Sequence, residues 1–79
     1  MYIEVTVDLQ KYNRNKIDLR LSDYYTIKKL IDLSWQVSDI ETLPRSGYWV
    51  RVKNKQKVFP GNQRLTDAGI TTGDIIEIL

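Results

Sequence analysis

The chain has 79 residues, of which 42% are hydrophobic and 28% are charged, and its formal net charge at pH 7 is +2. This composition is typical of one small globular domain, which has room for a single core but not for a buried catalytic cavity with its supporting shell. The lack of cysteine excludes disulfides and thiolate metal sites, and so low a net charge gives little support to the binding of nucleic acid or anionic lipid.

The N-terminal third predicts a β-hairpin. Residues 2–9 alternate strictly between apolar and polar side chains, and this period of two indicates a half-buried strand. After a polar, asparagine-rich segment, residues 17–21 alternate again, so the two strands are expected to pair. The same N-terminal segment has neither the basic region nor the long apolar run of a signal peptide, and no segment approaches the ~18 apolar residues of a membrane span. We therefore expect no membrane insertion.

Residues 22–37 change to helical spacing. Either Thr26 or Asp23 is expected to cap the helix, because its side-chain oxygen can accept a hydrogen bond from a free backbone N–H group. Trp35 is expected to pack in the core, whereas Tyr24 and Tyr25 could face either the core or the solvent. The residues that fall on one helical face, at i, i+3, i+4, i+7 and i+8, are Ile27, Leu30, Ile31, Ser34 and Trp35.

Two short strands are expected after a loop marked by Pro44 and Gly47. In residues 48–52 the alternation places Trp49 and Arg51 on the face opposite to Tyr48, Val50 and Val52. Val58 and Phe59 form a second strand, which Pro60 ends. The Pro60-Gly61 pair predicts a type II turn, because glycine tolerates the positive φ angle that the third turn position requires.

The last segment predicts a short turn and a final strand. Residues 64–70 can form a single helical turn, Gly73 opens a turn, and residues 74–79 alternate. In this strand Ile76 and Ile78 share one face, while Ile75, Glu77 and Leu79 share the other.

The predicted order is therefore β-β-α-β-β-β, without repeats or linkers, in a single domain covering residues 1–79. One helix must cover the apolar face of a mixed sheet, which defines an α+β architecture. An N-terminal hairpin, one crossing helix and a later strand that pairs beside the first strand make the β-grasp, or ubiquitin-like, arrangement.

Segments spread over the whole chain carry a family resemblance, and they read "YIEVTVDL", "DLRLSDY", "IKKLID", "WVRV" and "RLTDAGITTGDIIEIL". They resemble ubiquitin-like domains and, more closely, the YukD/EsaB family. Its members are free-standing ubiquitin-like proteins encoded with the type VII (ESX/WXG100) secretion machinery of Gram-positive bacteria. In actinobacterial systems a similar domain is fused to a membrane component. The resemblance thus implies a cytosolic docking role beside the secretion ATPase.

Two kinds of chemistry are not expected. The chain contains no histidine, and its aspartates fall mainly at turns, caps or outward strand positions, so we expect no enzymatic activity, no metal and no cofactor. Covalent conjugation requires that an enzyme activate the C-terminal carboxylate, and a flexible tail that ends in Gly-Gly suits this chemistry because glycine lets the backbone approach closely. Because Glu77, Ile78 and Leu79 lie within the predicted strand and no two glycines are adjacent, we expect no conjugation.

Protein docking is the preferred function. If the strands that carry Trp49 and Ile75 are neighbours, Trp49, Arg51, Ile75 and Leu79 form one outward patch on the sheet. Tryptophan and arginine are enriched at binding hot spots, and a contiguous apolar patch on a small domain usually has a use. In the alternative interpretation, Trp49 folds over the sheet edge and belongs partly to the core. A further alternative is a sheet edge that binds a partner by strand addition.

A basic loop supports the main rival function. Lys53, Lys55 and Lys57 lie close together after Arg51 and could contact the phosphates of nucleic acid or an anionic membrane. Lysines at sheet edges also keep a small sheet soluble and discourage edge pairing, which is the simpler explanation.

From the resemblance and the outward patch together, we expect a cytoplasmic adaptor or regulator of type VII secretion, associated with the membrane only through the secretion machinery. Its expected partner is a cytosolic domain of the membrane-bound secretion ATPase or of an adjoining membrane component.

Overall fold

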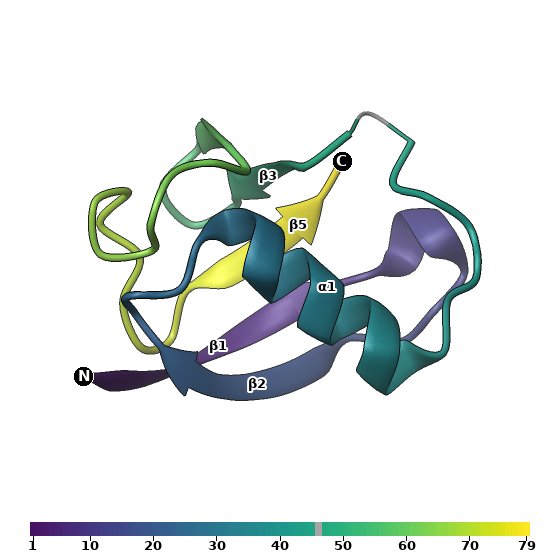
Figure 1. Ribbon diagram of the computed structural model, residues 1–79, viewed down its shortest axis with the longest axis horizontal. Coiled ribbons are helices and arrows are strands. Elements are labelled where there is room, and N and C mark those ends of the chain that lie inside the picture. The colour runs from purple at the N-terminus through teal and green to yellow at the C-terminus, as the bar shows by residue number, and fades with distance from the viewer. Residues whose placement is uncertain (46) are drawn as a thin grey trace.

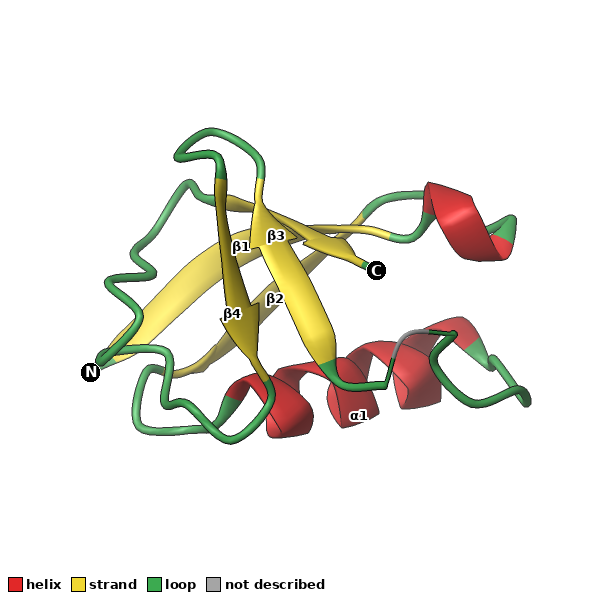
Figure 2. Cartoon of the chain, turned by 90° about the horizontal axis from the view of Figure 1, so that it is seen from above, coloured by secondary structure: helices red, strands yellow, loops and turns green. Residues whose placement is uncertain are grey.

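The computed structural model describes residues 1–45 and 47–79. Within them, one α-helix crosses one face of a five-stranded sheet whose strand order is β2-β1-β5-β3-β4 (Figures 1 and 2). This is the α+β, β-grasp architecture that the sequence predicts. The elements are β1 (Tyr2–Asp8), the 3-10 helix η1 (Gln10–Tyr12), β2 (Ile17–Ser22), α1 (Ile27–Ser38), β3 (Trp49–Val52), β4 (Lys57–Pro60) and β5 (Ile75–Ile78).

The strand pairing confirms the predicted hairpin and the predicted meeting of the first and last strands. β1 and β2 are antiparallel, with Ile3 opposite Leu21 and Val7 opposite Ile17. β5 lies parallel to β1 and antiparallel to β3, while β4 pairs with the outer side of β3. The last strand therefore lies at the centre of the sheet, between the first strand and the third.

The core lies between the sheet and α1, as the view along the sheet shows (Figure 2). Helical spacing turns Ile27, Leu30, Ile31 and Ser34 inward, and all of them are buried. Trp35 is only half-buried at the edge of this core, where its ring meets that of Tyr12 at 4.8 Å and its indole N–H donates to the Thr42 carbonyl. Tyr24 and Tyr25, which the sequence leaves open, are both exposed.

Thr26 is the N-cap of α1, and its side-chain oxygen accepts a hydrogen bond from the Lys29 N–H at 3.1 Å. The Ile27 and Lys28 N–H groups donate to the carbonyls of Gln63 and Gly61, each at 2.9 Å. The segment after β4 thus satisfies backbone donors that a helix start leaves free. No helix among the described residues combines the length and apolarity needed to cross a membrane.

The predicted type II turn at Pro60-Gly61 is wrong. Gly61 does not have a positive φ angle, and the turn is closed one step later, by the Gln63 N–H donating to the Pro60 carbonyl at 3.3 Å. Glycine is needed here for space instead. A Cβ atom at residue 61 would lie 2.5 Å from the Tyr48 Cβ and 2.7 Å from the Tyr48 carbonyl oxygen. The turn residue therefore reflects close packing of two chain segments, which turn statistics do not include.

Candidate protein-docking surface

The face of the sheet opposite to α1, here called the open face, carries the four residues of the predicted patch. β3 and β5 are neighbours, with Arg51 opposite Glu77, and the Leu79 N–H donates to the Trp49 carbonyl at 3.2 Å. Strand alternation buries Val50 and Val52 against the core and turns Trp49 and Arg51 outward. Trp49 is 45% exposed, and it belongs neither to the core cluster nor to the side chains packed against it.

Glu77 divides this surface. Its carboxylate accepts a hydrogen bond from the Arg51 guanidinium at 3.0 Å and lies 3.8 Å from the Lys11 ammonium. Because Glu77 stands between Ile75 and Leu79 on the same strand face, the apolar surface is not continuous from one to the other. The predicted patch is therefore split into an apolar end at Trp49 and Leu79 and a charged centre at Arg51 and Glu77. Ile75 lies beyond that centre.

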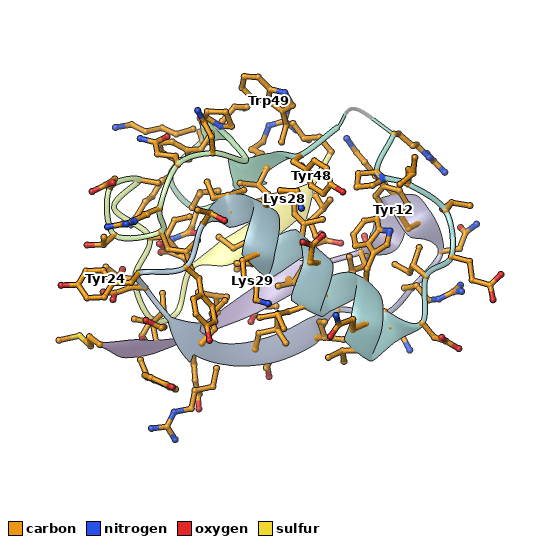
Figure 3. The ribbon with its side chains drawn as sticks, in the orientation of Figure 1. Tyr12, Tyr24, Lys28, Lys29, Tyr48 and Trp49 are labelled. Atoms are coloured by element: carbon orange, nitrogen blue, oxygen red, sulfur yellow. The ribbon has the colours of Figure 1, made fainter. Side chains whose placement is uncertain are left out.

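The apolar end extends onto β4. Pro60 lies opposite Trp49 and Val58 opposite Arg51 in the β3–β4 register, and the Val58 side chain is 46% exposed. Sequence reasoning missed both residues as surface components because it limited the strand to Val58 and Phe59, which is too short to show an alternation, whereas β4 extends from Lys57 to Pro60. The pairing of β3 with β4 is the signal that finds them, and it becomes visible only in the fold. Figure 3 shows Trp49 at the margin of the molecule, pointing away from it.

The predicted basic loop is largely neutralised within the domain. Lys53 donates to Asp8 at 3.0 Å, and Lys55 donates to Asp74 at 2.8 Å and to the Gly69 carbonyl at 2.6 Å. Both carboxylates are buried, with 3% exposure each. Among the described residues, Lys57 has no ion-pair partner and is exposed. The structure thus does not group the three lysines into one available phosphate site.

The burial of Asp8 and Asp74 was not evident from the sequence. Burial opposes ionisation of Asp8, but the Gln10 N–H and the Lys53 ammonium outweigh it and hold the Asp8 pKa below its ordinary value. Burial likewise opposes ionisation of Asp74, and hydrogen bonds from Lys55, Asn54 and the Thr71 N–H hold the Asp74 pKa low. The described residues contain no cluster of acidic side chains arranged to hold a metal ion. The open face thus places the half-exposed Trp49 indole beside the Arg51–Glu77 ion pair.

Comparisons with known proteins agree with this description. Residues 2–78 match the family model described as "WXG100 protein secretion system (Wss), protein YukD". The chain is 54% identical to the "ESX secretion system protein YukD" of Bacillus subtilis (strain 168) over 79 residues, which cover 100% of both chains. It is 33% identical over 78 residues to the "Type VII secretion system accessory factor EsaB" of Staphylococcus aureus (strain Newman), covering 99% of this chain and 96% of the relative.

Proposed function

The chain belongs to the YukD family of the WXG100 protein secretion system, and we propose that it acts there as a non-conjugated ubiquitin-like adaptor or regulator. It docks in the cytosol onto another protein and catalyses no reaction. The partner is a cytosolic domain of the membrane-bound secretion ATPase or of an adjoining membrane component, which holds the domain at the membrane. The name of the Staphylococcus aureus relative, an accessory factor, supports a role beside the secretion machinery.

The observation that carries the proposal is the exposed Trp49 side chain on the open face. A tryptophan that is 45% exposed leaves a large apolar area in water, and a partner that covers this area gains the corresponding hydrophobic free energy. Arg51 lies on the same face and is already held in place by Glu77 at 3.0 Å. A partner therefore meets a guanidinium whose side-chain freedom is already restricted, which lowers the entropic cost of contact.

The rival function, binding of nucleic acid or an anionic membrane, has less support. Lys53 and Lys55 are occupied by Asp8 and Asp74, so a phosphate would have to compete with a buried carboxylate for each ammonium group. Breaking such a pair leaves an uncompensated buried charge, which is unfavourable. Lys53 and Lys55 therefore stabilise the fold by neutralising buried carboxylates, and this use competes with phosphate binding.

Substitution of Trp49 by alanine tests the docking proposal. We expect Trp49→Ala to weaken crosslinked recovery of a secretion component from cells about tenfold or more, the effect typical of a hot-spot aromatic residue. The free energy of unfolding should change by less than about 1 kcal/mol, because the side chain is half-exposed and lies outside the core. Tyr24→Ala is the matched control, since Tyr24 is also exposed but lies at another margin of the molecule (Figure 3).

Two results would contradict the proposal. A large loss of stability in Trp49→Ala would mean that the side chain belongs to the core. Recovery of RNA alone, without any secretion component, would favour the rival function. The unfolding measurement therefore tests the core placement of Trp49, and the pull-down tests the nucleic-acid alternative.

A further inference from the structure

A shallow groove of about 590 Å³ lies where the start of α1 meets the start of β3 and the end of β4. Its lining comes from segments far apart in the sequence, which the fold brings together beside Trp49. Figure 3 shows Lys28 and Tyr48 next to each other and Trp49 beyond them at the margin. The lining residues are Thr26, Lys28, Tyr48, Trp49, Pro60, Gly61 and Asn62.

The groove is preformed by close backbone packing. Gly61 is buried, and the space that its missing Cβ leaves is filled by the Tyr48 Cβ and carbonyl oxygen. The Gly61 carbonyl accepts a hydrogen bond from the Lys28 N–H at 2.9 Å, which ties the floor of the groove to the first turn of α1. A partner therefore meets a site whose backbone needs little rearrangement, which favours binding.

The groove has one sign of charge. Lys28 is the charged residue among those that line it, and its ammonium group lies 4.8 Å from the centroid of the Tyr48 ring. The Lys28 ammonium also pairs with Asp32 at 3.1 Å, but both side chains are accessible to solvent, so water screens this pair and a ligand can compete for the ammonium. The Lys28 and Lys29 N–H groups already have acceptors, which leaves the Lys28 side chain as the source of positive charge.

We propose that this groove binds an acidic linear segment of the partner protein, with an apolar side chain packed against Trp49 and Tyr48 and an adjacent carboxylate paired with Lys28. The inference rests on the docking function proposed above and names the chemistry that the partner supplies. Trp49 belongs both to the groove and to the open face, so one partner can cover the two together. Nucleic acid fits the groove less well, because phosphate-driven binding draws on several cations, and among the described residues that line the groove Lys28 is the single cation.

Peptide selection tests this inference, and it does not require the partner to be identified. A library of random linear peptides is selected on the wild-type protein, and the recovered peptides are then measured individually. We expect the recovered peptides to combine acidic and apolar residues. They should bind the Lys28→Glu variant at least about tenfold more weakly than the wild type, because the substitution replaces an attractive charge in the contact with a repulsive one. Lys29→Glu, which makes the same change at the adjacent exposed helix position outside the lining residues, should bind as the wild type does. Lys28→Gln serves if the charge reversal disturbs folding.

A spectroscopic readout locates the binding site. On addition of a selected peptide, the indole N–H resonance of Trp49 should shift. The indole N–H of Trp35 donates to the Thr42 carbonyl and lies outside the groove, so its resonance should stay in place.

The inference is overturned if selection yields no peptide, if the peptides are basic or neutral, or if they bind Lys28→Glu as tightly as the wild type. Lys28-dependent binding of an oligothymidine probe in place of any acidic peptide would also overturn it, in favour of nucleic acid. These outcomes are separable from failure of the docking function. If Lys28→Glu leaves recovery of the secretion component intact while Trp49→Ala reduces it, the groove assignment fails and the docking function stands.

Discussion

Asp74 illustrates how a single polar side chain can organise this small domain. Its carboxylate lies between the turn before β5 and the turn after β3, and it accepts hydrogen bonds from Lys55 and Asn54 at 2.8 Å and from the Thr71 N–H at 3.0 Å. Asn54 in turn accepts from the Ile75 N–H at 3.0 Å. At 3% exposure, the carboxylate depends on these partners to remain ionised.

Replacement of Asp74 by asparagine should therefore destabilise the domain in a pH-dependent manner. We expect Asp74→Asn to lower the free energy of unfolding at neutral pH by about 1–3 kcal/mol. The substitution removes the ion pair with Lys55, and the new side-chain N–H₂ group replaces an oxygen that accepts hydrogen bonds from neighbouring donors. The pKa of Asp74 is lower in the folded than in the unfolded state, so its contribution is fully present above about pH 4 and is lost as the pH falls through the folded pKa. Urea denaturation over a pH series measures both effects.

The stability difference between the wild type and Asp74→Asn should accordingly shrink in acid. A difference that stays constant across the series would contradict the ionic role of Asp74. Asp67→Asn is the matched control, because Asp67 is an exposed aspartate in the same C-terminal segment.

At the scale of elements, the turn after β4 packs against the start of α1 and the residue before β3, and this contact determines the shape of the groove. The floor residue Gly61 leaves no room for a side chain against Tyr48. We expect Gly61→Ala to lower the free energy of unfolding by about 1–3 kcal/mol, as is typical when an extra carbon is forced into a packed site. Thermal or urea denaturation measures this change, and a Tyr48 ring that moves with it should show altered fluorescence.

Truncation of the tyrosine is informative here. The clash involves the Cβ and the carbonyl oxygen of Tyr48, which Tyr48→Ala retains, so that second substitution should not rescue Gly61→Ala. Asn62→Ala, a change at the adjacent exposed turn residue, should stay within about 0.5 kcal/mol of the wild type. Equal stability of Gly61→Ala and Asn62→Ala would show that the close approach does not constrain residue 61.

At the scale of the whole molecule, the sequence predicts the strands and their inward faces, which depend on local periodicity. It does not predict the side-chain pairs between neighbouring strands, which depend on the register of the sheet. Alternation finds the strands and the inward faces of β3 and β5, and the capping rule includes Thr26 among its two candidates. The ion pairs of Glu77 and Asp8 join side chains that are far apart in the sequence, and only the folded domain defines their relative positions. The same reason explains why the groove, built from three separate segments, has no sequence signature.

The distribution of charge in the folded domain leads to a last prediction. The net charge is +2, and the turn after β3 contributes lysines that mostly neutralise buried carboxylates. We therefore expect Lys53→Gln to lower the melting temperature, because Asp8 loses its counter-ion, whereas Lys57→Gln should stay within about 0.5 kcal/mol of the wild type. Neither change should reduce recovery of the secretion component beyond what the change in stability explains.

Oligonucleotide binding provides the complementary measurement. Fluorescence anisotropy with a labelled single-stranded DNA at low and at physiological salt should detect only weak association, because Lys53 and Lys55, two of the three lysines of the basic loop, are already paired with carboxylates. A tight complex that weakens steeply with salt and depends on Lys57 would instead establish the phosphate-binding function. The decisive comparison is between the two lysine variants. A structural role makes Lys53 the sensitive position in the thermal melt, whereas a phosphate-binding role makes Lys57 the sensitive position in the anisotropy titration.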